Sequence, residues 1–308
     1  LSVLAGRMPG AGLHAFHLRE GDLPDPDAPP SAWHEAVGLS PADDPAVVLV
    51  GDPFSIDAER LLVGLDFAYP DAVKVGGLAS GAQRPGEQVL LLDERIAHEG
   101  LVGIGLMGNA RIEPAVAQGC RALGKPMRIT QCRGHLLTQL DGQPVLDAVQ
   151  AVMVDASEED RRLASNTLSL GFEMDPFEGR DDAPWLIRNL VGIDSKTRGL
   201  YVGAELRRGR RVRFHVRDRV TSAEDLERTL AEAERSTGSA PAGALLFACL
   251  GRGTHLYGTP DHDTRAFEAR MGGVPLGGFF CAGEIGPVGG ATHLHGYTSA
   301  FALIQPRE

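Results

Sequence analysis

Two glycine-rich segments late in the chain carry the side chains best suited to bind a small molecule. The first, "FACLGRG", sets Arg252 between Gly251 and Gly253, just after an apolar run that ends in Cys249. Glycines let the backbone approach a ligand closely, exposed N–H groups in such a turn attract anions, and a guanidinium pairs with carboxylate or phosphate. The pattern predicts an anion-binding loop; its plain alternative is a tight turn with a solvated arginine.

The second segment, "FFCAGEIGPVGG", places a single acid in a bare backbone. Glu284 follows Gly283 at the end of an expected strand, and Phe279 and Phe280 precede them. A buried carboxylate is costly unless it pairs with a cation or accepts N–H groups, so we expect Glu284 to hold a ligand amine or Arg252 itself. The two phenylalanines are expected to form an apolar wall. The alternative is an exposed glutamate that caps a turn.

Other reactive residue types give weaker patterns. His293 and His295 in "THLHGYT" lie at positions i and i+2, hence on one face of a strand, but two histidines do not define a metal site. If haem binds, its axial ligand is expected to be His295, His293 or Cys249; otherwise no metal or cofactor is predicted. Cys249 is a candidate nucleophile, with core packing at a strand end as the commoner role. No phosphate-binding loop, G-x-S-x-G or H-E-x-x-H motif occurs.

Composition narrows the class of protein. The chain has 308 residues, 43% of them hydrophobic, with a formal net charge of −11, which is typical of a globular protein. Its longest apolar runs are too short to cross a bilayer, and its basic residues do not gather with aromatics. We therefore expect neither nucleic acid nor membrane as a partner. The four cysteines are widely spaced without a CxxC pair, which favours a cytoplasmic protein with reduced thiols.

The expected elements repeat along the chain. A buried strand (46–52), a helix (55–70) begun by a serine cap, and a strand entering a glycine turn (71–81) lead to a hairpin over 86–108. The same order returns after residue 243. The leading strands are offset by 198 residues (46 to 244) and the Gly-Gly pairs by 201 (76 to 277). This spacing predicts a mixed α/β fold of two related strand–helix–strand–hairpin halves packed together; chance agreement of generic elements is the alternative.

The glycine turn of the first copy, "VGGLASG", adds Gly76, Gly77 and Ser80 to the predicted ligand-site residues. This turn lacks the acid found in the second copy. The glycines are therefore interpreted as shared architecture, and Glu284 as the addition that makes the second turn a site.

Several segments together resemble the FIST domains, named for F-box and intracellular signal transduction proteins. "GALLFACLGRGTHLYG", "VPLGGFFCAGEIGPVGG", "YTSAFALI" and "PWLIRNLVGID" resemble the C-terminal half, and "VGGLASG" and "LVGIGLMG" the N-terminal half. The expected halves are residues 1–125 and 126–308. In such domains a further strand–helix–glycine-turn unit usually precedes the segment that matches Leu1, so one wall of a pocket is in doubt.

The resemblance implies a bacterial sensory domain that binds a small ligand, amino-acid-like or anionic, and signals through a protein partner. It provides no established catalytic residues, so a non-catalytic role is expected, and Arg188 in "PWLIRNLVGID" joins the predicted ligand-site residues. Some members of the family are described as haem-binding nitric oxide sensors, which is the first alternative. A cysteine-dependent enzyme and a protein-interaction adaptor are the others.

Overall fold

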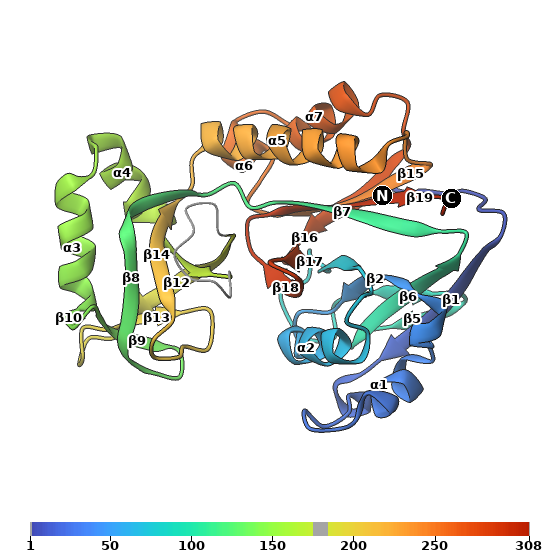
Figure 1. The fold of residues 1–308 in the computed structure, drawn as a ribbon, viewed down its shortest axis with the longest axis horizontal. Coiled ribbons are helices and arrows are strands. Elements are labelled where there is room, and N and C mark those ends of the chain that lie inside the picture. The colour runs from blue at the N-terminus through green and yellow to red at the C-terminus, as the bar shows by residue number, and fades with distance from the viewer. Residues whose placement is uncertain (1, 175–183, 308) are drawn as a thin grey trace. The chain divides into compact units, whose positions relative to one another are not determined.

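The computed structural model describes residues 2–174 and 184–307 and contains two compact units (Figure 1). The first unit comprises Leu1–Ala117 and Leu226–Glu308, and the second comprises Gln118–Asp225. The second unit is thus inserted into the chain of the first. Each is described by itself.

Two sheets form the centre of the first unit. The strands of the larger sheet are β1 (Ala11–Leu18), β2 (Ala46–Gly51), β3 (Lys74–Leu78), β6 (Leu101–Gly108), β17 (Gly283–Val288) and β18 (Ala291–His295), in the order β1-β6-β2-β3-β17-β18. The strands of the smaller sheet are β7 (Arg111–Ala117), β15 (Gly243–Cys249), β16 (Leu276–Cys281) and β19 (Ser299–Gln305), in the order β16-β15-β19-β7. Only β2–β3 and β15–β16 are parallel pairs among these strands.

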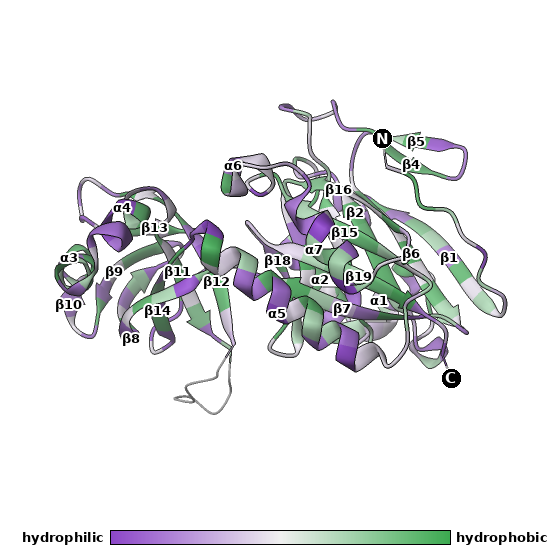
Figure 2. Cartoon of the chain, turned by 90° about the horizontal axis from the view of Figure 1, so that it is seen from above, coloured by the Kyte–Doolittle hydropathy of each residue, from purple (hydrophilic) through white to green (hydrophobic). Residues whose placement is uncertain are grey.

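Helices cover the outer faces of both sheets, so that the first unit has four layers (Figure 1). Helices α1 (Pro30–Val37) and α2 (Ala58–Ala68) pack on the larger sheet, with Trp33 and Leu61 in that core. Helices α5 (Arg219–Thr237) and α7 (His262–Arg270) pack on the smaller sheet. Between the sheets lies a further apolar cluster that includes Val75, Phe247 and Ala300. Along α5, hydrophobic and hydrophilic residues alternate, as a half-buried helix requires (Figure 2).

The two copies expected from the spacing are present as two equivalent sheet halves. In the first, β2 lies between the parallel β3 and the antiparallel β6, and β1 pairs with β6. In the second, β15 lies between the parallel β16 and the antiparallel β19, and β7 pairs with β19. Helix α2 connects β2 to β3, as α7 lies between β15 and β16 in the chain. The mixed α/β prediction is therefore confirmed.

Two local predictions for the first copy were wrong. Residues 86–108 do not form one hairpin: β4 (Leu90–Leu92) pairs with β5 (Arg95–Ala97), whereas β6 pairs with β1 and β2. The N-cap of α2 is Asp57, whose side chain accepts a hydrogen bond from the Arg60 N–H, and the Ser55 hydroxyl donates to Asp52 instead. Both differences arise because tertiary contacts chose between neighbouring turn residues of similar propensity.

The second unit is built around an antiparallel barrel. Its strands are β8 (Arg121–Arg133), β9 (Leu136–Leu140), β10 (Gln143–Pro144), β11 (Ser169–Glu173), β12 (Trp185–Ile193), β13 (Leu200–Val202) and β14 (Arg211–Val216). The long strand β8 pairs with β14 along its first part and with β9 along its last part, which closes the sheet. Phe172 and Phe214 fill the interior with Val145 of α3 (Val145–Asp155), while α4 (Glu158–Thr167) adds Leu163.

The remaining described elements are short. They are the 3-10 helices at Glu20–Asp22 and Pro41–Asp43 and the single-turn helix α6 (Thr254–Tyr257). Among residues 2–174 and 184–307, no helix combines the length and the apolar character that a bilayer crossing would need.

One glycine in each copy makes the same close contact, and this predicts a shared sensitivity. A Cβ on Gly76 would lie 1.9 Å from the Leu49 carbonyl oxygen, and one on Gly278 would lie 1.9 Å from that of Leu246. Each oxygen belongs to the paired residue of the neighbouring parallel strand. We expect Gly76→Ala and Gly278→Ala each to lower the free energy of unfolding by more than about 2 kcal/mol in urea denaturation, because the strands must separate.

Gly21→Ala is the control, since a Cβ there meets no atom within 4 Å. Its effect should stay within about 0.5 kcal/mol. Equal stability of the Gly278→Ala protein and the wild type would contradict the equivalence of the two copies.

Candidate functional site

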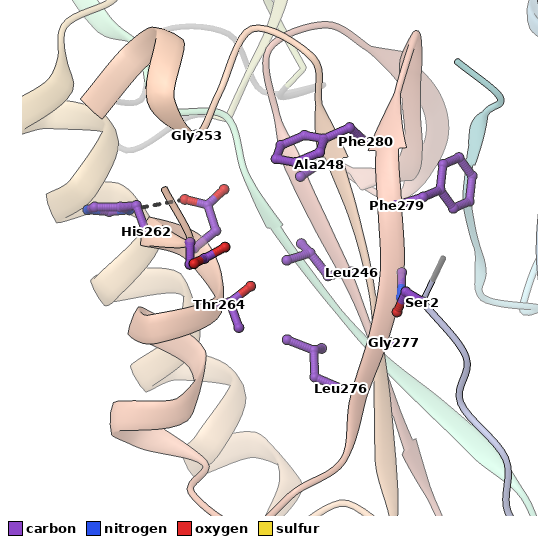
Figure 3. Close-up of a pocket in the computed structure, with 13 residues that line it drawn as sticks. Ser2, Leu246, Ala248, Gly253, His262, Thr264, Leu276, Gly277, Phe279 and Phe280 are labelled. Carbon is purple, nitrogen blue, oxygen red and sulfur yellow. Dashed lines mark hydrogen bonds and ion pairs between the residues drawn. The ribbon is translucent and has the colours of Figure 1, made fainter. Parts of the chain in front are cut away.

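A pocket of about 310 Å³ lies on the helix-covered side of β15 and β16 (Figure 3). Its walls come from the ends of β15 and β16, from the loop at Gly253, from the first turn of α7 and from Ser2. The lining residues are Ser2, Leu246, Ala248, Gly253, Asp261, His262, Asp263, Thr264, Leu276, Gly277, Gly278, Phe279 and Phe280. It thus combines an apolar sheet surface with a polar helix start, as ligand pockets commonly do.

The apolar wall follows from the alternation of side chains along two strands. Leu246 and Ala248 on β15 and Leu276 and Phe280 on β16 all point toward α7 (Figure 3). The Phe280 ring lies beside Ala248 near Gly253 and is 50% exposed, so it is available to cover a ligand. Phe279 points to the other side of β16, where its ring packs edge-on against Phe247 with centroids 5.6 Å apart. Most of the Phe279 side chain therefore serves the core between the sheets.

The polar side is held in place by a buried ion pair. Arg252 Nε donates to Asp263 Oδ2 at 2.7 Å and its Nη2 donates to Oδ1 at 3.2 Å. The Ser299 hydroxyl donates to the same carboxylate at 2.6 Å. Burial alone would raise the pKa of Asp263, but the charge and hydrogen bonds of Arg252, with Ser299 and His262, hold that pKa below its ordinary value. Asp263 is therefore ionised, and the pair is neutral overall.

Two aromatic rings complete the surroundings of Arg252. Its Nη2 donates to the Tyr257 hydroxyl at 2.6 Å, and its Nη1 donates to the Tyr297 carbonyl at 3.4 Å. The Tyr257 ring stacks on His262 at a centroid distance of 3.5 Å, and His262 Nδ1 is 3.1 Å from Asp263 Oδ1. The predicted anion-binding arginine is thus an enclosed support: its side chain has no exposed surface, and a ligand anion would have to displace Asp263 to reach it.

The first turn of α7 supplies the polar groups that face the pocket. Asp261 has φ +58° and makes no side-chain cap to the helix, and the first α-helical bond runs from the Arg265 N–H to the Asp261 carbonyl. The N–H groups of His262, Asp263 and Thr264 precede that bond, so no carbonyl of the helix accepts from them. Donors at a helix start favour a negatively charged or carbonyl-bearing ligand group.

Glu284 is fully buried, which contradicts the alternative of an exposed turn-capping acid. It lies on β17, paired with Gly77 of β3 on one side and with His295 of β18 on the other. Its Oε2 accepts a hydrogen bond from the Thr298 N–H at 3.0 Å. Glu284 and Gly283 therefore belong to the larger sheet and do not line the pocket of Figure 3.

The glycine turn of the first copy lies against the same region. A Cβ on Gly77 would meet Cys281 Sγ at 2.3 Å, so this glycine allows β3 to approach the end of β16. The Ser80 hydroxyl donates to the Phe280 carbonyl. Gly76, Gly77 and Ser80 thus support the pocket strand from behind and are absent from the residues that line it.

The loop between β15 and α6 contributes one pocket residue. Gly253 lines the pocket, with φ +58°, next to Phe280. Gly251 lies against the Tyr297 ring, which a Cβ would approach to 2.6 Å, and its N–H donates to Cys249 Sγ at 3.4 Å. These glycines are explained by close packing, as the plain alternative expected.

Arg188 lies on β12 of the second unit, where it pairs with Leu170 of β11. It is not among the residues that line the pocket of the first unit. Its assignment to the ligand site rests on the family resemblance and stays a prediction.

The histidines and cysteines form no metal cluster among the described residues. His293 and His295 lie on β18 with ring centroids 6.1 Å apart, and His295 Nε2 is 3.0 Å from the Gly286 carbonyl. Because a carbonyl only accepts, Nε2 carries the proton and would have to give up this bond to ligate iron. Haem binding stays a prediction, which absorbance of the haemin-titrated protein would test.

The sequence led to one face of the pocket but missed the other. Gly253, Phe279 and Phe280 were predicted and line it, whereas Asp261, His262, Asp263 and Thr264 were not identified. A signal was available in "DHDTRAFEAR", where an acid in the first turn of an expected helix follows the arginine loop by 11 positions. Such an acid at the helix start is a natural partner for a buried arginine.

Comparison with known proteins defines the class to which this fold and pocket belong. The model of the FIST N domain matches residues 7–143, and that of the FIST C domain matches residues 146–287. The chain belongs to the FIST family, whose domains are associated with sensory function and signal transduction. The two models meet inside the second unit, near β10; the boundary predicted at residue 125 stays a prediction.

Mycobacterial proteins are similar over most of the chain. Uncharacterized protein Rv0628c of Mycobacterium tuberculosis is 37% identical over 260 residues, which are 83% of this chain and 67% of that protein. Uncharacterized protein Mb0898c of Mycobacterium bovis is 36% identical with the same coverage.

The buried pair predicts a specific stability defect. Asp263→Asn leaves the Arg252 charge buried without its ionic partner, so we expect the free energy of unfolding to fall by about 3–5 kcal/mol. Because the pKa of Asp263 is lower in the folded than in the unfolded protein, the pair stabilises the fold above about pH 4 and this contribution is lost as pH falls through the folded-state pKa. The variant should lack that acid-dependent loss.

Asp261→Asn is the matched control, since Asp261 is exposed and has no salt bridge among the described residues. Urea unfolding between pH 3 and pH 7 measures both effects. Similar losses in the two variants would contradict a special role for the buried pair.

The thiols predict a second result. Burial, together with the charges of Glu284 and Cys249, raises the pKa of Cys281 far above its ordinary value, and its side chain is fully enclosed. We expect N-ethylmaleimide at pH 8 to leave Cys281 unmodified in the folded protein and to modify it in urea, as mapped by mass spectrometry. The half-buried Cys249 is the internal comparison. Faster labelling of Cys281 than of Cys249 would contradict the burial described here.

Proposed function

We propose that this protein is a non-catalytic sensory domain that binds a small ligand in the pocket between β15, β16 and the first turn of α7. The observation that carries this proposal is the pocket itself: an aliphatic and aromatic wall faces unsatisfied N–H groups at a helix start across about 310 Å³. Such a site suits a small molecule with one apolar part and one polar or anionic end.

The apolar end of the ligand would lie on the sheet. Leu246, Ala248 and Leu276 form a continuous surface on β15 and β16, and Phe280 stands at its upper edge (Figure 3). Burial of apolar area against this surface provides the affinity, and the exposed Phe280 ring gains most from being covered.

The polar end would lie at α7. The Arg252–Asp263 pair fixes the first turn and cancels the Asp263 charge, so a ligand carboxylate meets N–H donors without a net repulsion from that acid. The exposed carboxylate of Asp261 lines the same pocket and suits a ligand amine. A ligand with both groups is amino-acid-like; one with a carboxylate alone is anionic.

The pocket strand also offers a route by which binding could alter the rest of the unit. Phe280 accepts a hydrogen bond from Ser80 at the end of β3, and β16 continues into β17, which pairs with β3 in the larger sheet. A ligand that favours one position of Phe280 therefore biases the contact between the two copies. A partner protein would respond to that bias.

Removal of the aromatic wall tests the site. Thermal unfolding with the standard amino acids and small carboxylates identifies a ligand by the rise in Tm. For such a ligand, we expect Phe280→Ala to weaken binding about fivefold to thirtyfold, since about 1–2 kcal/mol of apolar burial is lost.

Phe67→Ala on α2 is the control, because Phe67 is 59% exposed and lies away from the pocket lining. It should bind as the wild type does. A ligand whose affinity is the same in all three proteins binds elsewhere, and the pocket assignment is then wrong.

A further inference from the structure

A second, more apolar cavity lies under the first residues of the chain. Residues 2–8, here called the strap, run along the smaller sheet, where Ser2 Oγ accepts a hydrogen bond from the Gly278 N–H and Leu4 packs near Gly243 and Gly277. Beneath the strap is a cavity of about 410 Å³. Its lining residues are Leu4, Ala5, Gly6, Arg7, Met8, Leu13, Val48, Ile104, Leu106, Ala242, Gly243, Leu245, Pro275 and Ile304.

The cavity exists because the two sheets differ in width. The larger sheet has six strands and the smaller has four, and β1 and β6 lie at the edge of the larger one. Leu13 on β1 and Ile104 on β6 are 62% and 41% exposed, although Val48 and Leu245 beside them pack into the cluster between the sheets. Figure 2 shows hydrophobic residues along β1 and β6 at this edge. The core between the sheets is thus open at one side.

One charged side chain belongs to this cavity. Arg7 on the strap is exposed, and among the described lining residues there is no acid to pair with it. Arg7 also takes part in no salt bridge or side-chain hydrogen bond within residues 2–174 and 184–307. A long aliphatic surface with a single available cation at its rim is complementary to a long aliphatic chain with a single negative charge.

We propose that this cavity binds an aliphatic monocarboxylate, of the class of medium-chain fatty acids. The chain lies between the strap and the sheets against Leu13, Ile104 and Leu245, and the carboxylate pairs with Arg7 at the rim. A polyanion such as a phosphate ester finds one cation only, and an amine finds no acid, so neither fits this lining. The site is separate from the pocket at α7 and does not depend on the ligand proposed there.

The two parts of the ligand contribute unequally. Each methylene removed from water adds to affinity in proportion to its area, so chain length dominates. The ion pair at an exposed arginine is weak and screened by salt, so it selects for a carboxylate by only a few-fold. Decanoate and decanol therefore separate the two contributions, because they share a chain and differ in charge.

Calorimetric titration with decanoate, below its micelle concentration, tests the proposal. One decanoate should bind per wild-type chain. Arg7→Glu should weaken decanoate by roughly fivefold to tenfold and leave decanol unchanged. Leu13→Glu, at a position that is already largely exposed, should weaken both by more than tenfold, because it places a charge against the chain. Arg84→Glu and Val89→Glu repeat these changes at exposed positions outside the cavity and should bind as wild type.

Two outcomes overturn the proposal. Decanoate binding that is unaffected by both Arg7→Glu and Leu13→Glu places the fatty acid elsewhere. A wild-type dimer that becomes monomeric in Leu13→Glu, measured by sedimentation without ligand, shows that a second copy of the chain covers this face instead. Loss of folding in Leu13→Glu does not obscure the result, since Arg7→Glu changes only an exposed strap residue.

Discussion

The ion pair between Arg252 and Asp263 determines the shape of the region on which the candidate site depends. It joins the loop after β15 to the first turn of α7, and Ser299 ties the same carboxylate to β19. Three elements distant in sequence thus meet at one buried charge pair. A fully enclosed guanidinium is stable only with such compensation, so the loop cannot move without the helix. The pocket is consequently a rigid cradle whose polar side is set by an interaction that its ligand never touches.

The difference between the two copies explains why the site lies in the second. Both copies hold a glycine against a neighbouring carbonyl at the same place in a parallel strand pair. After that strand, the first copy continues into the separate hairpin β4–β5, whereas the second continues into β17 and β18, which join the sheet of the first copy. Glu284 is carried on this exchanged hairpin. It therefore helps to connect the copies, while the strand before it, with Phe280, keeps its outer face for the pocket.

Local patterns in the sequence revealed the repeated strands, the helices and the glycine turns, because each depends on residues close together in the chain. They also led to Gly253, Phe279 and Phe280. They did not reveal that Asp263 is the acid beneath Arg252, since that choice depends on where α7 starts relative to the loop. The destination of β17 was equally hidden: "GEIGPV" describes a strand but not the sheet it joins. Closure of the second unit required β8 to change partners midway, which a strand pattern does not encode.

The strap connects matters that otherwise look separate. Ser2 lines the pocket at α7, and residues 4–8 line the cavity between the sheets. Whatever is joined ahead of this segment, by nature or for purification, begins within two residues of the first of these sites. An affinity tag placed there would compete with small molecules for the same surface, and a screen with that protein could miss a genuine ligand. A tag after the last strand, β19, starts from the opposite end of the chain and leaves the strap unmodified.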